Sequence, residues 1–586
     1  MSSGQNGLDI DGIRRELAGA PDAGRLKPLG LGRVVAGAGA VEGLAEVVAG
    51  LARPDGSLPH PRGNLPRPRG DLPRPGADRP RAGNGLPPPG GAVVVLAGAT
   101  PMSAGGQDLR TVVEQALDRS FAVEWVILGP DDGLVHADEP TVAAAAAAAA
   151  GADCVVTVGS GTITDIGKAA APAGAPLVTV QTATSVNGYA DPFSVLLLRG
   201  VKRTTPSRWP DALVIDPAVL HDAPQDLNRA GAGDMMAMFT ASADWYLASA
   251  VAGNDRASGT RPGGATASTP TSGTPTAHPG DPPYHPGVAG LVRAHGSRLL
   301  RLAAGLSGDS AAADGGIPAA GGSVPAAGGG VPATGGGVPA TGGGAPAAGG
   351  GVRGGSGQDP GDLAELAGIL TLSGIAMGVA GSTAPASGME HAVSHLLEMV
   401  ATARGEPASF HGTQVGVASI VAARTWAHVL RRIADGGLDR PAALPDPGAV
   451  AGRIGSAFAA VDPSGAMAAE CFADYARKLR RLGSWGDPGD PLAALRASWK
   501  AHHEVLDDIL IDPAALIGAL RAAGLPVQFC DLAEPVDDET ARWAVSNCPL
   551  MRQRFGVADL AMLLGAWEDT DVEEMLAGTT GDPGPP

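Results

Sequence analysis

Aromatic side chains and cysteines are both scarce in this chain. Phenylalanine, tryptophan and tyrosine together make up only 3% of its 586 residues. The sequence has four cysteines, which form no CxxC pair and no regular framework: Cys154, Cys471, Cys530 and Cys548. A disulfide scaffold and a structural zinc site each need such a pattern, so we expect neither and predict reduced thiols.

Basic residues are also in deficit, which leaves the chain with a formal net charge of -18. Phosphate backbones are bound through clustered Lys and Arg, so we expect no nucleic-acid partner. The N-terminus, MSSGQNGLDI, lacks the basic and apolar regions of a secretory signal, and no apolar run approaches membrane-spanning length. We therefore expect a soluble, cytoplasmic protein without membrane insertion.

Glycine and proline, by contrast, are abundant, with 88 and 51 copies. They are concentrated in residues 53–89, which are rich in Pro and Arg, and in residues 252–360, which end in five seven-residue repeats such as VPATGGG. These tracts have too few apolar side chains to offset the entropy lost on ordering, so we predict two disordered insertions. A short apolar island at residues 290–306 can still form a helix of the folded part.

Outside these tracts, short apolar runs alternate with helical segments. A strand and a helix are predicted within residues 33–52, followed by strands at 92–97, 123–128, 153–158, 176–180 and 212–216 and helices at 109–117, 141–152 and 163–171. This alternation indicates a parallel sheet covered on both faces. Helical periodicity dominates from residue 363 onward. We therefore predict an α/β domain from residues 1–52 and 90–217, and an all-α domain from residues 218–251 and 361–575.

Polar residues follow two of the predicted strands at one edge of the sheet. The first strand ends in the turn Gly159-Ser160-Gly161-Thr162, which leads directly into a helix. Glycines let backbone N–H groups approach a diphosphate, and a helix N-terminus adds partial positive charge. Alone, the turn is equally well explained as a tight connection without a ligand. The next strand ends in a loop of hydroxyls and amides at residues 181–191, and the two together favour a cofactor cleft.

A local basic patch stands out in this acidic chain. It consists of Lys202, Arg203 and Arg208. The patch can neutralise the phosphate of a substrate, or it can be an ordinary solvated surface. Both interpretations stay open at this point.

The segment from Ala386 to Gly416 is hardest to explain by folding alone. His391 and His395 lie four residues apart, which on a helix places both imidazoles on one face. His411 opens the next apolar-periodic segment, and Asp234 lies among small residues of another helical run. A carboxylate and imidazoles with an open position suit a catalytic Zn2+, Fe2+ or Ni2+ ion. The alternative is that these are ordinary polar residues at helix ends.

Five motifs, in this order, resemble those of a known family: GSGTITDIGK, TATSVNGYADPFS, AGAGDMMA, SGIAMGVAGSTAPASGMEHAVSH and HGTQVGV. The family is that of the sn-glycerol-1-phosphate dehydrogenases, within the iron-containing alcohol dehydrogenase and dehydroquinate synthase-like superfamily. The resemblance covers the chain outside the two low-complexity tracts, including the ending NCPLMRQRFGVADLAMLLG. It implies a dehydroquinate synthase-like fold, with an N-terminal α/β nucleotide-binding domain, a helical C-terminal domain and the site between them.

The same resemblance assigns roles to individual residues. One divalent ion, Zn2+, Fe2+ or Ni2+, would be held by Asp234, His391 and His411. Asp234 and His395 would be the catalytic residues, with His395 beside the substrate as a candidate proton relay. NAD or NADP would bind through Gly159, Ser160, Gly161, Thr162, Asp165, Thr182, Ser185 and Asp191. The substrate would contact Asn187, Asp234, His395, Lys202 and Arg203.

The implied reaction is reversible hydride transfer between NAD(P)H and the C2 carbonyl of dihydroxyacetone phosphate, which gives sn-glycerol 1-phosphate. Asn187 departs from the family, which usually has Asp there, and this leaves the exact substrate open. Two other readings remain: a dehydroquinate synthase-like sugar-phosphate cyclase and a noncatalytic nucleotide-binding relative. We expect a small phosphorylated molecule as the substrate, and a homo-oligomer.

Overall fold

The computed structural model of the chain describes residues 8–51, 91–129, 135–198, 201–252, 282–306, 358–484 and 489–579. The predicted insertion at 53–89 lies outside these residues, as does most of the predicted insertion at 252–360. The four cysteines are free, as the sequence predicted.

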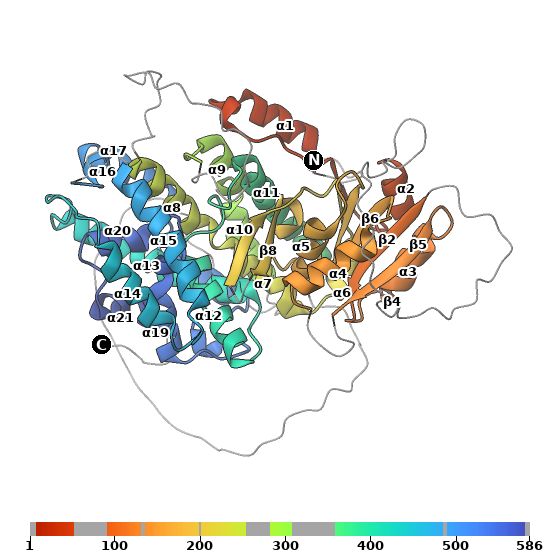
Figure 1. Ribbon diagram of the computed structural model, residues 1–586. Coiled ribbons are helices and arrows are strands. Elements are labelled where there is room, and N and C mark those ends of the chain that lie inside the picture. The colour runs from red at the N-terminus through yellow and green to blue at the C-terminus, as the bar shows by residue number, and fades with distance from the viewer. Residues whose placement is uncertain are drawn as a thin grey trace, which may run out of the picture.

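Within the described residues, six parallel strands form the central sheet, in the order β1-β10-β7-β6-β2-β5. Their bounds are β1 (Arg33–Ala36), β2 (Ala92–Gly98), β5 (Ala122–Leu128), β6 (Cys154–Gly159), β7 (Leu177–Gln181) and β10 (Ala212–Ile215). The predicted bounds of β2, β5, β6, β7 and β10 differ from the observed ones by at most one residue at either end, and β1 lies within the range 33–52, where a strand was expected. The parallel α/β part of the predicted fold is therefore confirmed, and it forms the right-hand half of the molecule in Figure 1.

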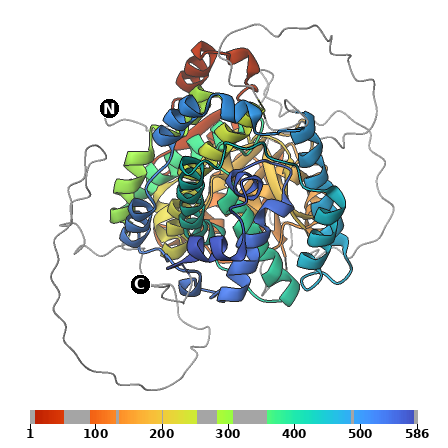
Figure 2. The ribbon, with the colours of Figure 1, turned by 90° about the vertical axis from the view of Figure 1, so that its left-hand side faces the viewer.

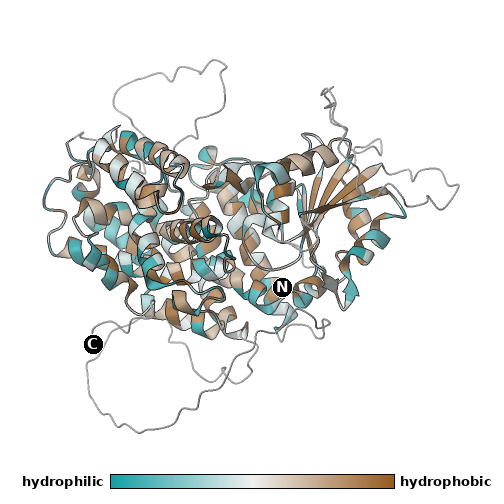
Figure 3. Ribbon diagram, turned by 60° about the horizontal axis from the view of Figure 1, so that its bottom comes forward, coloured by the Kyte–Doolittle hydropathy of each residue, from teal (hydrophilic) through white to brown (hydrophobic). Residues whose placement is uncertain are grey.

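Helices cover both faces of the sheet because its strands are apolar on both sides (Figure 3). Val93 and Val95 share a buried cluster with α2 (Leu44–Ala49) and α3 (Leu109–Leu117). Val94 and Leu96 point the other way, into a cluster with α4 (Glu139–Ala149) and α5 (Gly161–Ala170). Consecutive strand residues thus serve opposite faces, as the period of two requires.

Several elements were not predicted from the sequence. Helix α1 (Ile10–Gly19) precedes the first predicted strand, and the two-stranded pair β3 (Ser103–Ala104) and β4 (Gln107–Asp108) precedes α3. An antiparallel pair, β8 (Phe193–Leu198) and β9 (Val201–Pro206), contains part of the basic patch. The apolar island forms two helices, α9 (Pro286–Arg293) and α10 (Gly296–Gly305), where one was expected.

The rest of the described chain is helical, as predicted, and its helices lie in front in Figure 2. The run around Asp234 divides into α6 (Pro217–Asp222), α7 (Gln225–Met235) and α8 (Met238–Val251). The later helices are α11 (Pro360–Ala380), α12 (Met389–Arg404), α13 (His411–Ala434), α14 (Pro447–Phe458), α15 (Ala466–Ser484), α16 (Ala493–Ala497), α17 (Trp499–Ile509), α18 (Pro513–Ala522), α19 (Asp538–Asn547), α20 (Val557–Leu563) and α21 (Asp569–Leu576). Short 3-10 turns are η1 (Ala23–Arg25), η2 (Gly188–Ala190), η3 (Phe529–Asp531) and η4 (Cys548–Met551).

Helix α11 corrects one expectation. It has 21 residues and contains an 18-residue window with a mean hydropathy of 1.7, so by length and composition it could cross a membrane. The prediction that no apolar run approaches membrane-spanning length is therefore wrong. In the structure 83% of the apolar window is buried inside the protein. It packs with Leu213 and Ile215 of the sheet and with Met235 of α7 in one apolar cluster. The apolar side chains of α11 therefore pack between the sheet and the helices.

Candidate active site

A cavity of about 1990 Å³ opens beyond the carboxyl ends of β6 and β7 and reaches the helices α7, α12 and α13. Its lining contains every residue that the sequence assigned to cofactor, substrate or metal, apart from Arg203. These residues are Gly159, Ser160, Gly161, Thr162, Asp165, Thr182, Ser185, Asn187, Asp191, Lys202, Asp234, His391, His395 and His411. Residues separated by more than 200 positions in the sequence therefore line one cavity.

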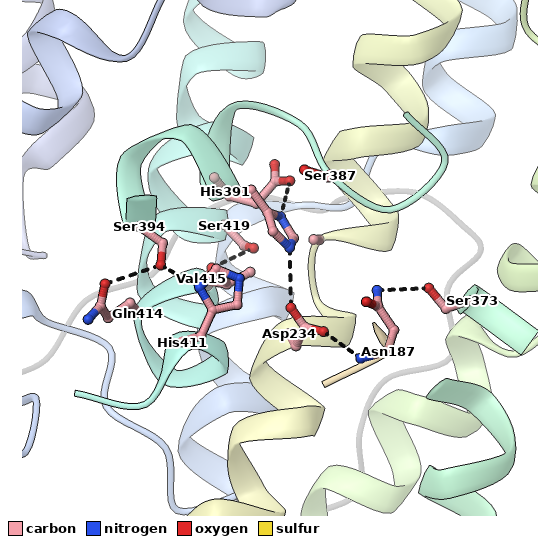
Figure 4. A network of polar contacts seen from close by, with 12 residues as sticks. Asn187, Asp234, Ser373, Ser387, His391, Ser394, His411, Gln414, Val415 and Ser419 are labelled. Carbon is pink, nitrogen blue, oxygen red and sulfur yellow. Dashed lines mark hydrogen bonds and ion pairs between the residues drawn. The ribbon is translucent and has the colours of Figure 1, made fainter. Parts of the chain in front are cut away.

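A carboxylate and two imidazoles meet inside this cavity. One ligand atom from each of Asp234, His391 and His411 lies within 4.8 Å of the other two. Figure 4 shows Asp234 on α7 facing His391, with Oδ1 3.2 Å from Nε2. That Oδ1 atom is buried and has no hydrogen-bond partner among the described residues. A buried acceptor without a partner is costly, and a divalent cation between these three groups would satisfy it.

Small residues explain how α7 and α13 come close enough to form this group. The stretch Ala-Gly-Ala-Gly-Asp234 packs against the start of α13, where Gly412 follows His411. A Cβ atom on Gly233 would lie 2.3 Å from the carbonyl oxygen of Gly412. A Cβ atom on Gly412 would lie 1.9 Å from the carbonyl oxygen of Ala230. The glycines therefore permit a backbone contact that brings Asp234 beside His411.

The carboxylate of Glu390 contacts the side of the His391 ring that faces away from Asp234. Glu390 Oε1 lies 3.0 Å from His391 Nδ1, which leaves Nε2 toward Asp234. Glu390 Oε2 in turn accepts a hydrogen bond of 2.8 Å from the hydroxyl of Thr240. Burial raises the pKa of Glu390, but His391 and the hydrogen bonds from backbone N–H groups, including that of Gly388, together outweigh burial and lower that pKa overall. Such outer partners orient a histidine and increase its basicity as a ligand.

His411 has a comparable arrangement on the other side. Its Nδ1 lies 3.0 Å from Ser394 Oγ and 3.1 Å from Glu398 Oε1, so Nε2 is left for an ion. Glu398 also forms an ion pair with Lys202, which lies on β9. Burial raises the pKa of Glu398, but Lys202 and His411 outweigh it and lower that pKa to about 2. Both imidazoles thus carry an ionised carboxylate behind them.

His395 lines the cavity beside these groups without joining the triad. Its ring centroid lies 5.5 Å from that of His411 and 6.5 Å from that of His391. Arg552 Nη2 lies 3.2 Å from His395 Nδ1. Burial, followed by the charge of Arg552, lowers the pKa of His395 well below its usual value. This shift favours the neutral imidazole.

Comparisons with known proteins relate part of the chain to a family of dehydrogenases. Residues 89–224 match the sequence model of the family described as iron-containing alcohol dehydrogenase. The chain is related to the iron-containing alcohol dehydrogenases. It is 27% identical over 318 residues, 54% of this chain and 59% of the other, to a protein of Bacillus licheniformis named NAD(P)+ glycerol-1-phosphate dehydrogenase. It is 36% identical over 134 residues, 22% of this chain and 34% of the other, to a protein of the same name from Bacillus velezensis.

The aligned part of this chain spans 59% and 34% of the lengths of these two curated relatives. Among solved structures, an iron-containing alcohol dehydrogenase of Thermococcus thioreducens is 13% identical, with coverage of 94% of this chain and 98% of that chain. The TM-score of that comparison is 0.41. The fold class rests on the parallel sheet and the helices themselves.

In this relative of the iron-containing alcohol dehydrogenases, the Gly-Ser-Gly turn fits a cofactor diphosphate. Ser160 is the N-cap of α5, and its side chain makes no capping hydrogen bond. Gly161 and Thr162, at the start of α5, line the cavity, and their backbone N–H groups donate no hydrogen bond to the Ser160 side chain. A Cβ atom on Gly161 would lie 2.7 Å from Val186 Cγ2, so glycine keeps the turn narrow.

The two acids predicted for the cofactor are held by a lysine that the sequence analysis missed. Lys168 Nζ lies 3.1 Å from Asp165 and 2.9 Å from Asp191, and its side chain is fully buried. It also donates a 2.7 Å hydrogen bond to the carbonyl oxygen of Gly188. Burial raises the pKa of Asp191 to about 6 even with Lys168 beside it. Lys168 thus connects the helix after the cofactor turn to the loop that carries Asn187.

Asn187 lies at the junction of this loop and the metal triad. Its backbone N–H donates to Asp234 Oδ2 at 3.2 Å, and its side-chain Nδ2 donates to Ser373 Oγ at 3.1 Å (Figure 4). Where the family usually has Asp, an amide therefore lines the cavity as both donor and acceptor. Thr182 and Ser185, which were also predicted to contact the cofactor, are buried in the same loop.

The structure does not bring the basic patch together in the cavity. Lys202 lines the cavity, whereas Arg203 forms an ion pair of 2.8 Å with Asp474. Neighbouring residues of β9 point to opposite sides of the strand, which separates these two cations. Arg208 lies 2.8 Å from Asp211 and donates to the carbonyl oxygens of Pro172 and Ala175. The unpredicted strand pair is the reason for the difference.

Three further residues of the site were missed, and only one had a sequence signal. Glu398 lies seven residues after His391 and three after His395, so it shares their helix face. That spacing was visible in the sequence. Glu390 is adjacent to His391 but points its carboxylate back at the ring, and Arg552 comes from a turn more than 150 residues away. No local pattern indicates these two contacts.

Proposed function

We propose that this chain is a metal-dependent, NAD(P)-linked oxidoreductase that reduces dihydroxyacetone phosphate to sn-glycerol 1-phosphate, or acts on a similar small polyol phosphate. The proposal rests above all on the triad of Asp234, His391 and His411, whose ligand atoms lie within 4.8 Å of one another. The cavity that holds the triad also contains the Gly-Ser-Gly turn. The named relatives support the choice of a phosphorylated substrate.

Different residues of the site would have different roles in such a reaction. When bound, the metal supplies Lewis-acid polarisation of a carbonyl and the nicotinamide supplies a hydride. Asp234, His391 and His411 would hold the ion, while the contacts of Glu390 and Glu398 with the Nδ1 atoms leave the imidazole Nε2 atoms free to bind it. Gly159, Ser160 and Gly161 offer backbone N–H groups to a diphosphate. Asn187 and His395 line the space between, where substrate oxygens would be bound.

The choice between NAD(P)H oxidation and other chemistries is tested with the full chain loaded separately with Zn2+, Fe2+ and Ni2+. NAD(P)H absorbance is followed with dihydroxyacetone phosphate, dihydroxyacetone and, in the reverse direction with NAD(P)+, glycerol. We expect turnover with the phosphorylated ketone, formation of the sn-1 isomer and loss of turnover in His391→Ala. No change in NAD(P)H with any of these substrates, despite full metal loading, would contradict the proposal.

We also propose that the enzyme is a cytoplasmic homo-oligomer with a small phosphorylated molecule as its partner, without nucleic-acid binding or membrane insertion. The acidic net charge of -18 supports the absence of nucleic-acid binding, because it disfavours contact with phosphate groups. The burial of most of the apolar window of α11 inside the protein supports the absence of membrane insertion. Light scattering of the purified full chain measures the oligomeric state, and a monomer at micromolar concentration would contradict that part.

A further inference from the structure

Arg552 makes a set of contacts that its sequence position does not suggest. It follows the turn η4 and extends to the start of α12, where Nη1 donates to Ser387 Oγ at 3.1 Å and to the carbonyl oxygen of Gly388 at 3.3 Å. Its Nη2 lies 3.2 Å from His395 Nδ1. Three contacts to one loop and one imidazole hold the guanidinium in place.

The contact with His395 decides which ring nitrogen carries a proton. A guanidinium has only N–H donors, and it stays protonated under all ordinary conditions. His395 Nδ1 can therefore take part in this contact only as an acceptor, without a proton of its own. A neutral imidazole has one ring proton, which must then be on Nε2.

We propose that Arg552 is a positioning residue that fixes His395 in the tautomer with its proton on Nε2, so that His395 meets the substrate as a hydrogen-bond donor. This rests on the proposed function, because His395 lines the same cavity as the metal triad. A proton relay through the ring would need Nδ1 to take up a proton, and there it would face the guanidinium. His395 would thus serve as a donor and not as a relay.

A fixed donor suits the reduction of a ketone. Hydride addition to the carbonyl carbon leaves the former double-bond electron pair on oxygen, and a solvent water supplies the proton that completes the alcohol. A donor aimed at that oxygen binds more strongly as negative charge develops there, so it acts on kcat more than on KM. Loss of one such donor typically lowers kcat by about 100-fold to 1000-fold.

Nitrogen NMR of the zinc-loaded full chain, labelled at histidine, tests the tautomer directly. The His395 signal is assigned from its loss in His395→Gln. We expect a single set of nitrogen shifts with the proton on Nε2, both with and without substrate. A proton on Nδ1, or averaging between the two tautomers, would overturn the proposal.

Three variants extend the test. Arg552→Met removes the donor, and we expect mixed tautomers and a fall in kcat of about tenfold, with KM changed by about twofold or less. Arg552→Lys keeps an N–H donor and should restore part of the Nε2 tautomer and of kcat. Arg554→Met is the matched control, because it removes a neighbouring guanidinium that donates to Ser382, Thr383 and the carbonyl oxygen of Ser387. A control variant that disturbs the His395 tautomer as much as Arg552→Met would contradict a specific role for Arg552.

The two proposals can fail separately. A fixed Nε2 proton in a chain that reduces no ketone would support the role of Arg552 and contradict the proposed function. Turnover of dihydroxyacetone phosphate by a chain with averaged His395 signals would support the function and overturn the role of Arg552.

Discussion

Replacement of Asp234 by Asn separates a metal ligand from a structural carboxylate, because the two side chains have the same shape. Asp234 Oδ2 accepts a hydrogen bond from the backbone of Asn187, which an amide oxygen can keep. Asp234 Oδ1 is buried without a hydrogen-bond partner among the described residues and faces His391 Nε2 at 3.2 Å. An amide N–H at that position can donate to Nε2, since the other ring nitrogen contacts Glu390.

The expected effects on metal binding and on the metal-free protein have opposite signs. One carboxylate charge about 4 Å from a unit positive charge contributes about 4 kcal/mol at an effective dielectric constant of about 20. A divalent ion at ligand distance interacts more strongly, so Asp234→Asn should weaken Zn2+ binding by at least about a thousandfold. Without metal, removal of an unsatisfied buried acceptor should stabilise the fold by about 1 kcal/mol.

Chemical and thermal unfolding with and without Zn2+, together with calorimetric titration of Zn2+, measure both effects. Wild-type protein should gain stability from Zn2+, as ligand linkage requires, and the variant should gain almost none. Asp226→Asn is a matched control on the same helix, because the side chain of Asp226 is 76% exposed. Zn2+ affinity of Asp234→Asn within tenfold of wild type, or a metal-free variant destabilised by about 2 kcal/mol or more, would refute the assignment of Asp234 as a ligand.

Three further predictions concern residues around the triad. Glu398→Gln removes the carboxylate behind His411 and should weaken metal binding by about 10-fold to 100-fold in equilibrium dialysis, whereas Glu406→Gln on the nearby loop should not. Burial, with a contribution from the charge of Glu390, raises the pKa of Asp244 to about 8. The folded state therefore keeps a proton that the unfolded chain releases near pH 4, so stability should fall by up to about 1.4 kcal/mol per pH unit between about pH 4 and about pH 8. Denaturant unfolding across this range should show a flatter profile for Asp244→Asn. Gly161→Ala would place a Cβ atom 2.7 Å from the nearest side chain and should raise the KM for NAD(P)H by about tenfold, whereas Gly151→Ala, with no atom within 4 Å of the added Cβ, should leave it unchanged in steady-state kinetics.

Features that depend on the local periodicity of the sequence were predicted correctly. The strands of the sheet are runs of buried apolar residues, and the turn that follows β6 leads into a helix as expected. The placement of His391 and His395 on one helix face follows from their spacing of four, and both line the cavity. Local backbone geometry alone produces these features, so the sequence suffices to predict them.

The strand pair β8 and β9 is a feature that the sequence patterns did not predict. Its residues alternate between faces, but the basic side chains of β9 were interpreted as one patch because no strand was recognised there. The three cations have separate partners, and Lys202 alone reaches the cavity. Likewise α11 has the length and hydropathy of a membrane span, and only its burial between the sheet and α7 shows its role.

The sequence by itself determined the parallel sheet, the helical second half and the types of side chain that can hold a divalent ion. Only the tertiary structure decided that Asp234, His391 and His411 meet, and that Glu390, Glu398 and Arg552 support the three histidines. The physical reason is that periodicity reports the direction of each side chain from its own backbone. Which group it meets depends on the packing of distant segments, here on glycines that let α7 touch the start of α13.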